Sequence, residues 1–314
     1  MRAEKRTKKK KRTGLRIFLW SILGIFLILG GIVGYAVFQT KSTMDKIYEP
    51  VKEAANPVKL DGQNPFSVLI LGIDQRDGDV GRSDTTMVAT VNGTTNKAQI
   101  LSIPRDTKTE IIGHDSTNKI NAAYAYGGVK MAEDTVTNFL NGIPINYYIK
   151  INMEGLKDLV DAVGGVEVYN DMDISLGKND VNNNEIDFKK GNVKLDGTDA
   201  LAYVRIRKTD ARGDFGRQMR QQQVIQAVVN KVATTQTLWN FDEILSAVGK
   251  NMQTDLTMTD ITRIAKNYIS ARNNVENMTV AGDGGISDGI WYYNVSDAER
   301  QKLHDSLAKN LEIK

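Results

Sequence analysis

The 314-residue chain contains no cysteine and only two histidines, His114 and His304. Without cysteine it can form no disulfide and has no thiol nucleophile. Two histidines are too few for a histidine-rich zinc site. Any catalysis must therefore depend on carboxylates and arginines, with or without a hard cation.

Two common catalytic motifs are also missing. The sequence has neither the phosphate loop G-x-x-x-x-G-K-[ST] nor the nucleophile elbow G-x-S-x-G. A soluble part of about 250 residues is long enough to build one substantial core, which must supply the stability that disulfides would otherwise add. The absence of disulfides fits a Gram-positive cell surface better than an animal secretory pathway.

The N-terminus combines a basic tail with a long apolar run. Residues 1–16 are rich in Lys and Arg, and residues 17–38 are uncharged and apolar. As a helix this run is about 33 Å long, which matches a hydrocarbon core of about 30 Å. Positive charge stays on the cytoplasmic side. The pattern predicts a single-pass anchor in the cell membrane, with a cytoplasmic tail and the rest of the chain outside.

Two other readings of this segment are weaker. A basic run alone can be a nucleic-acid arm, but here it precedes a spanning segment. A cleavable signal peptide has a shorter apolar core and a small-x-small cleavage site. The exit at residues 35–40 offers no convincing site, so we expect an uncleaved signal anchor and no nucleic-acid partner.

Residues 39–64 are polar and include Pro50 and Pro57, which predicts a linker or stalk. Residues 65–314 then alternate between strand and helix patterns, which favours an α/β domain. Strands are expected at 66–73, 85–91, 98–103, 147–151, 166–169 and 278–281. Helices are expected at 129–140, 153–163 and 215–233, with two or three more in the last eighty residues. Residues 171–187 are polar and predicted to be a surface loop.

Charged residues gather at the ends of the first three predicted strands. Asp74 ends the first, Asp84 opens the second, and Arg105 follows the third. Loops at one edge of an α/β sheet often form the ligand crevice. If these strands are neighbours, the two aspartates could share a Mg²⁺ ion, which prefers oxygen ligands. Taken one at a time, such residues are more often turn formers or surface ion pairs.

A second basic cluster lies around the predicted helix at 215–233. Arg205 and Arg207 share one face if their segment is extended. Arg217, Arg220 and Gln221 share one face of the helix, in its first turns. Basic groups there oppose the helix dipole unless an anion lies among them, which suggests a bound phosphate. A solvated basic face is the alternative, although the opposite apolar face already supplies a core contact.

Six motifs, in this order, are similar to those of the LytR-CpsA-Psr family, over about residues 65–233. Within the family the chain resembles the teichoic acid transferases of bacilli, and the resemblance implies a central mixed β-sheet flanked by helices. The motifs are residues 69–74 (LILGID), 82–85 (RSDT), 102–107 (SIPRDT), 119–124 (KINAAY), 202–207 (AYVRIR) and 213–218 (GDFGRQ).

The resemblance implies a phosphotransferase. Such enzymes take an anionic glycopolymer, here expected to be wall teichoic acid, from an undecaprenyl-pyrophosphate carrier in the membrane. They transfer it to the C6 hydroxyl of N-acetylmuramic acid in peptidoglycan and form a phosphodiester.

The resemblance also implies roles for individual residues. Asp74 and Asp84 match acidic positions associated with Mg²⁺ (or Mn²⁺), and the sequence leaves open which of them binds metal and which acts as base. The expected catalytic residues are Asp84, Arg105, Arg205 and Arg217. The expected substrate-binding residues are Arg82, Arg105, Lys119, Asn121, Arg205, Arg207, Arg217, Arg220 and Gln221.

Two other functions fit the same residues. A lipid-pyrophosphate hydrolase would use the same arginines and metal, with water as the acceptor. A cell-surface regulator that binds anionic polymers without chemistry would need the basic patch but not the acidic pair.

Overall fold

The computed structural model describes residues 47–51, 58–74, 80–178, 185–232, 241–249 and 251–313. The predicted basic tail and the predicted anchor at 17–38 lie outside these residues. Within the described ranges, no helix has the length and apolar character needed to cross a membrane.

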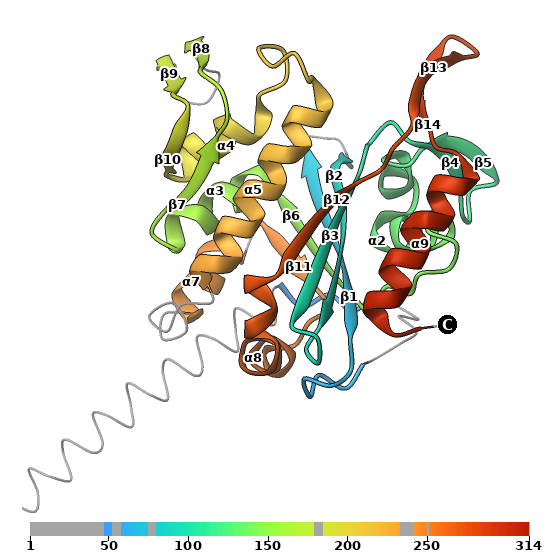
Figure 1. The fold of residues 1–314 in the computed structure, drawn as a ribbon, viewed down its shortest axis with the longest axis horizontal. Helices are drawn as coiled ribbons and strands as arrows, with labels where there is room; N and C mark the ends of the chain where they lie inside the picture. Colours follow the sequence, from blue (N-terminus) through green and yellow to red (C-terminus); the bar gives the residue numbers. More distant parts are fainter. Residues whose placement is uncertain are drawn as a thin grey trace, which may run out of the picture. The chain divides into compact units, whose positions relative to one another are not determined.

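A six-stranded mixed sheet forms the centre of the fold, with the order β11-β6-β1-β2-β3-β12 (Figure 1). Antiparallel pairing joins β1 to β2, β2 to β3 and β6 to β11, whereas β1–β6 and β3–β12 are parallel. The predicted mixed sheet is confirmed. The strands are β1 (Phe66–Asp74), β2 (Arg82–Asn92), β3 (Lys97–Ile103), β6 (Tyr147–Asn152), β11 (Met252–Thr254) and β12 (Val275–Thr279).

Helices cover both faces of this sheet because its central strands are apolar on both sides. On one face Leu69, Leu71 and Leu101 pack against helices α2 (Ala122–Phe139) and α9 (Asp297–Leu311). On the other face Phe66 and Val68 pack near Tyr268, between α8 (Met258–Asn267) and the 3₁₀ helix η1 (Ile269–Asn273). Alternating strand side chains point to opposite faces, which places one apolar set in each layer.

Helix α2 begins seven residues before the predicted start at 129. It is kinked at Gly127 and Gly128, where the backbone leaves helical geometry, and Gly128 has a positive φ of 65°. Glycine tolerates this conformation at little cost. The kink interrupts the helical spacing, so the sequence pattern reveals only the second part of the helix.

A second hydrophobic cluster lies beside the sheet, in what we call the side lobe (Figure 1). Its helices are α3 (Met153–Ala162), α4 (Gly197–Arg205), α5 (Asp214–Val232) and α7 (Phe241–Val248). Its strands are β7 (Val166–Asn170), β8 (Ile174–Lys178), β9 (Glu185–Phe188) and β10 (Gly191–Leu195). The predicted loop at 171–187 is wrong in its described part, because β8 and β9 pair as an antiparallel hairpin and bury Ile174 and Phe188.

Helix α5 joins the side lobe to the sheet. Its Gln222 Nε2 donates to Ser102 Oγ on β3 at 2.9 Å and to the carbonyl oxygen of Met278 on β12 at 3.1 Å. These contacts fix the middle of α5 relative to the sheet. Two short hairpins, β4 (Lys108–Ile111) with β5 (Ser116–Lys119) and β13 (Asp283–Ser287) with β14 (Ile290–Asn294), complete the fold.

The described parts of the predicted linker belong to the folded body. Ile47 and Leu60 are buried, Glu49 N donates to the Thr254 carbonyl oxygen at 2.9 Å, and Tyr147 Oη donates to the Val58 carbonyl oxygen at 3.1 Å. Folded structure therefore begins before the predicted boundary at residue 65.

Candidate active site

The strand ends predicted to meet do lie at one edge of the sheet. Strand β2 runs antiparallel to both β1 and β3, so its first residues lie beside the last residues of its neighbours. Asp74 pairs in register with Arg82, and Thr86 pairs with Ile103. We call the region where β1 ends, β2 begins and β3 ends the site edge.

One chain of ion pairs begins at the site edge. Arg105 Nη1 lies 2.9 Å from Asp84 Oδ1, and Arg105 Nε lies 3.6 Å from Asp106 Oδ2. Lys119 Nζ lies 2.7 Å from Asp106 Oδ1. Burial would lower the pKa of Arg105, but the charge of Asp84 and its hydrogen bond outweigh burial and raise that pKa. Arg105 is therefore a permanent cation, held by the carboxylate of Asp84.

Backbone hydrogen bonds hold the loop that carries Arg105. Thr107 N donates to the Pro104 carbonyl oxygen at 3.0 Å, and Ile120 N donates to the Thr107 carbonyl oxygen at 2.8 Å. The N–H of Asn121 donates to the Arg105 carbonyl oxygen at 3.3 Å. Asn121 is buried at the start of α2, where it ties this helix to the Arg105 loop.

A second set of ion pairs lies in the first turn of α5. Arg217 Nη2 lies 2.8 Å from Asp214 Oδ1, and Arg207 Nε lies 3.7 Å from the same oxygen. Arg217 is only 8 % exposed, and its buried Nε has no hydrogen-bond partner among the described residues. Buried donors are usually paired, so a free one deserves an explanation.

The two sets of charges belong to one site. Burial lowers the pKa of Arg217, Asp214 opposes this shift, and the positive charge of Arg105 lowers the pKa further. Asp84 and Arg207 also act on Arg217. Around Arg217, the guanidinium groups of Arg105 and Arg207 face the carboxylates of Asp84 and Asp214, while Asp106 pairs with Arg105 and Lys119. The nearly dehydrated guanidinium of Arg217 keeps a free Nε donor among the described residues at this point. Such a site favours an anion.

Arg205 and Arg207 are not arranged as predicted. Residues 202–205 are the last turn of α4, and only Ile206 and Arg207 leave the helix. The expectation of an extended segment is therefore wrong, although both arginines are exposed. Arg82 is also exposed, and neither Arg205 nor Arg82 forms an ion pair with another described residue.

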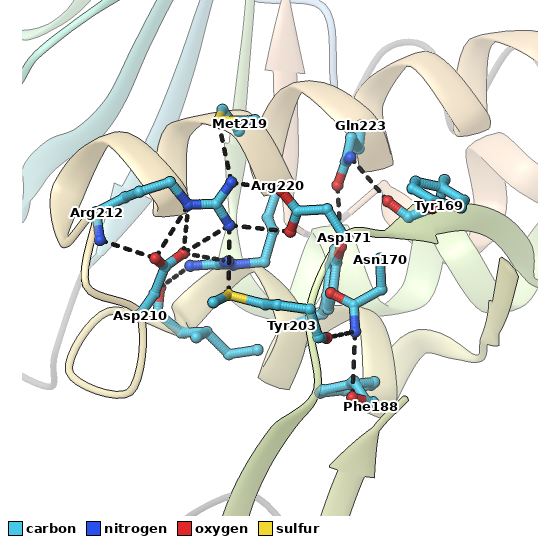
Figure 2. Close-up of polar contacts among 12 residues, drawn as sticks. Tyr169, Asn170, Asp171, Phe188, Tyr203, Asp210, Arg212, Met219, Arg220 and Gln223 are labelled. Carbon is cyan, nitrogen blue, oxygen red and sulfur yellow. Dashed lines mark hydrogen bonds and ion pairs between the residues drawn. The ribbon is translucent and has the colours of Figure 1, made fainter. Parts of the chain in front are cut away.

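Arg220 lies in a separate, buried network (Figure 2). Its Nη1 lies 2.7 Å from Asp210 Oδ2, and its Nη2 donates to the Ile206 carbonyl oxygen at 2.8 Å. Arg212 binds the same carboxylate, with Nη2 at 3.0 Å from Oδ2. Burial alone would raise the pKa of Asp210, but hydrogen bonds from Arg212 and Arg220 hold it well below its ordinary value. Arg220 is 2 % exposed, and its Nε, like that of Arg217, has no hydrogen-bond partner among the described residues. Its two ion-pair and carbonyl contacts place Arg220 in the Asp210 network and not among the charges of Arg105 and Arg217.

Gly216 explains how this network fits beneath the helix. A Cβ atom at this position would lie 2.0 Å from Asp210 Oδ2. Only glycine lets the carboxylate approach the first turn of α5 so closely. One turn after Arg217, Gln221 is buried on the same helix, and the spacing i, i+4 puts both on one helical face.

The sequence suggested no role for two carboxylates of this site, Asp106 and Asp214, although Asp106 follows Arg105 at the end of the third predicted strand. Both lie inside motifs that carry the family resemblance. Asp214 is the first residue of α5, where an acid is favoured by the helix dipole. It supplies part of the negative charge that the basic first turn requires.

The donor set at the site edge fits a hard cation. Asp74 and Asp84 offer only carboxylate oxygens, and no group of three or more Asp, Glu or His among the described residues could enclose a metal. Mg²⁺ typically takes one or two carboxylates, several waters and phosphate oxygens of the substrate. The two aspartates therefore fit a metal whose coordination a phosphate ligand completes.

Comparisons with known proteins agree with this geometry. The family model described as the LytR_cpsA_psr family matches residues 34–309. A relative from Bacillus anthracis, named polyisoprenyl-teichoic acid–peptidoglycan teichoic acid transferase TagU, is 46 % identical over 306 residues, which is 95 % of this chain and 98 % of that protein.

Solved structures show the same similarity. The crystal structure of B. subtilis TagU has a TM-score of 0.65 and 38 % identity, covering 80 % of this chain and 99 % of that one. A structure of TagT bound to LI-WTA has a TM-score of 0.68 and 30 % identity, covering 82 % and 94 %. The protein described above therefore belongs to the LytR-CpsA-Psr family.

Proposed function

We propose that this chain is a polyisoprenyl-teichoic acid–peptidoglycan teichoic acid transferase. It moves a wall teichoic acid polymer, with one phosphate, from a polyprenyl-pyrophosphate carrier to the C6 hydroxyl of N-acetylmuramic acid. The names of the relatives support the reaction class, since they are teichoic acid transferases of similar length.

One observation carries the proposal in the molecule itself. Arg217 is buried, has a free Nε donor among the described residues, and lies next to two further guanidinium groups, those of Arg105 and Arg207. A pyrophosphate would satisfy the donor, because guanidinium groups match phosphate oxygens in geometry. A solvated basic face would not bury its central arginine.

The residues of the site suit phosphoryl transfer, which needs charge stabilisation and positioning more than covalent participation. Arg217, Arg105 and Arg207 would hold the two phosphates and stabilise the leaving phosphate. Arg205 and Arg82 are both exposed. They would extend the contact with the substrate from its phosphates to the polymer. Gln221 would donate an amide N–H from the same face of α5 as Arg217.

Asp74 and Asp84 would hold a Mg²⁺ or Mn²⁺ ion together with the substrate. When bound, the ion supplies positive charge to the phosphate oxygens. One aspartate of the pair would accept the proton of the attacking hydroxyl. Asp84 is already bound to Arg105 through one oxygen, which leaves its second oxygen for either task.

Localisation follows from the same proposal. A single N-terminal span over residues 17–38 would keep the catalytic body at the outer membrane surface, where the polyprenyl carrier presents its pyrophosphate. The membrane lipid would then hold both the enzyme and the donor.

The test is product analysis with and without acceptor. The full-length protein in detergent is incubated with a synthetic lipid-pyrophosphate donor, Mg²⁺ and a peptidoglycan oligomer, and the products are identified by mass. We expect a polymer–peptidoglycan phosphodiester and the lipid monophosphate. Release of free phosphorylated polymer at equal rates with and without acceptor would instead establish a hydrolase, and no turnover with Mg²⁺ would favour a binding protein.

A further inference from the structure

The β13–β14 hairpin projects from the same end of the molecule as the site edge (Figure 1). It follows β12, which runs parallel to β3, so the chain enters the hairpin at the end of the sheet where β3 delivers Arg105. At its base, Tyr293 N donates to the Asp106 carbonyl oxygen at 2.9 Å, and Tyr293 forms a bridge with Thr107. The hairpin is thus joined directly to the loop that carries Arg105.

The two faces of this hairpin have different surroundings. On one face, Lys108 Nζ of strand β4 lies 5.1 Å from the ring centre of Tyr292 and 3.3 Å from Ser287 Oγ. Side chains alternate along a strand, so Trp291 and Tyr293 point to the opposite face. That face, which we call the open hairpin face, carries the cross-strand pair Ile286 and Trp291.

The open hairpin face is strongly apolar yet exposed. Ile286 is 76 % exposed and Trp291 is 47 % exposed. Trp291 packs across Gly284, where an added Cβ would lie 2.8 Å from the indole. Because Gly284 has no side chain, one side of the indole can lie against the backbone of the neighbouring strand.

This apolar surface continues to the catalytic arginines. Tyr293, on the same face as Trp291, packs edge-on against Phe215, with ring centres 5.7 Å apart. Phe215 is 42 % exposed and lies in the first turn of α5, between Asp214 and Arg217. Tyr293 itself is buried (5 % exposed). The exposed rings are therefore Phe215, next to the residues that would hold the reacting phosphates, and Trp291, two residues before Tyr293 on the same face of β14.

The charge around this surface limits what could bind it. The chain has no Lys or Arg from residue 273 to residue 299, whereas Asp283 and Asp288 lie in the hairpin itself. Lys108 contacts the other face of the hairpin and offsets one of these two acids. The hairpin therefore has no basic cluster of the kind that anionic lipid surfaces attract, and none that would bind an anionic teichoic acid. An uncharged glycan backbone needs no such cluster. Its pyranose rings offer C–H faces that pack on aromatic side chains, which combine apolar area with a rigid shape.

From this arrangement we infer that the open hairpin face is the acceptor subsite, where Trp291 and Phe215 position the N-acetylhexosamine backbone of peptidoglycan. The inference rests on the proposed transferase function and adds the side from which the acceptor arrives. The anionic donor occupies the arginines, and the acceptor strand lies along the aromatic residues beside them.

The kinetic test uses the full-length protein in detergent, with peptidoglycan glycan oligomers and a lipid-pyrophosphate donor. Trp291→Ala should raise the KM for the oligomer by about two- to tenfold, the range for loss of one aromatic contact, and leave kcat and the donor KM unchanged. Trp291→Phe should restore part of the loss. Tyr169→Ala removes a comparably exposed aromatic side chain from β7 (56 % exposed) and is the control. An unchanged acceptor KM, or an equal rise in the donor KM, would overturn the assignment.

A binding test separates this inference from the proposed function. The chain has three tryptophans, Trp20, Trp239 and Trp291, so the fluorescence of Trp291 is the difference between the wild-type protein and Trp291→Phe. Titration with glycan oligomers alone should change this difference signal even if no transfer occurs. No change would reject the subsite. Both proteins are also moved from neutral detergent into phosphatidylglycerol vesicles. A blue shift of the difference fluorescence would then reject the subsite, because such a shift would place Trp291 in lipid.

Discussion

Two arginines one turn apart on α5 are both buried but differ in their partners. Arg220 has both a carboxylate and a carbonyl oxygen as partners, at 2.7 and 2.8 Å. Arg217 has the carboxylate of Asp214 at 2.8 Å and lies within the influence of Arg105 and Arg207. The Nε atoms of both arginines lack a hydrogen-bond partner among the described residues. We therefore expect removal of Arg220 to affect the fold and removal of Arg217 to affect the proposed binding of phosphate.

For Arg220 we expect a structural phenotype. Arg220→Ala leaves Asp210 and the Ile206 carbonyl oxygen without this partner, and breaking a buried pair typically costs about 3–5 kcal/mol. Arg205→Ala, at an exposed position, should change the free energy of unfolding by less than about 0.5 kcal/mol. Denaturant unfolding of the two variants measures this directly. Equal stability of both would mean that the Asp210 network does not hold the start of α5.

For Arg217 we expect a functional phenotype. Arg217→Ala should lower the transfer rate by about 100-fold or more, as removal of a preorganised charge typically does, without lowering the thermal stability. Inorganic pyrophosphate should raise the melting temperature of the wild-type protein and not that of Arg217→Ala. A variant with wild-type transfer and an unchanged pyrophosphate response would remove Arg217 from the site.

At the scale of elements, two buried acids, Glu133 and Asp255, lie where α2 packs on the sheet and have no part in the ion pairs of the candidate site. Glu133 on α2 is 9 % exposed, and burial, together with the charge of Asp255, raises its pKa to about 8. Asp255 follows β11, and burial raises its pKa to about 6, although it accepts a hydrogen bond from Tyr148 N at 2.8 Å. Burial therefore favours the protonated, uncharged form of both carboxyl groups.

The raised pKa of Glu133 gives a pH dependence of defined sign. Between its ordinary value of 4.5 and about 8, the folded protein retains a proton that the unfolded chain releases. The free energy of unfolding therefore falls as the pH rises through this window. Glu133→Gln should be more stable than wild type at pH 8, with a smaller difference at pH 5, as measured by urea unfolding. Glu154→Gln, at an exposed position on α3, is the control, and an equal gain at both pH values would contradict the assignment.

The whole molecule is divided between a compact body from Thr43 to Lys314 and the preceding residues. All residues of the candidate site belong to this body. Its hydrophobic clusters include one on each face of the sheet and one in the side lobe, and α5 joins the side lobe to the sheet. The proposed chemistry therefore belongs to the body, and the proposed membrane anchor belongs to the segment before it.

This division predicts different effects of truncation in solution and in cells. A chain that begins at Thr43 should retain transfer with a detergent-dispersed donor at a rate close to that of the full-length protein. In cells that lack other such transferases, export of the same chain without its anchor should restore little wall-linked teichoic acid, because the donor stays in the membrane. Phosphate analysis of purified cell walls measures the wall-linked teichoic acid. Full complementation by the exported body would refute the proposed role of the anchor.

The sequence by itself determined the strands that carry the site and the charged residues at their ends. One short apolar run ends at Asp74 and another ends just before Arg105. Both predict buried strands, because the length of an apolar run and the spacing of its side chains are local properties of the sequence. The same holds for the helix that begins near Phe215. The small hairpins, β10 and β11 were missed, because short or half-exposed strands leave little pattern.

Only the tertiary structure decided which charges are partners. The pairing of Asp84 with Arg105, the shared carboxylate of Asp214 and the burial of Arg220 cannot be read from the spacing of these residues along the chain. Burial and distance, which set the energy of a charge, are properties of the folded molecule. The sequence could therefore name the arginines, but only packing showed that Arg220 is held inside the fold by Asp210, whereas Arg105 and Arg217 act on each other near the site edge.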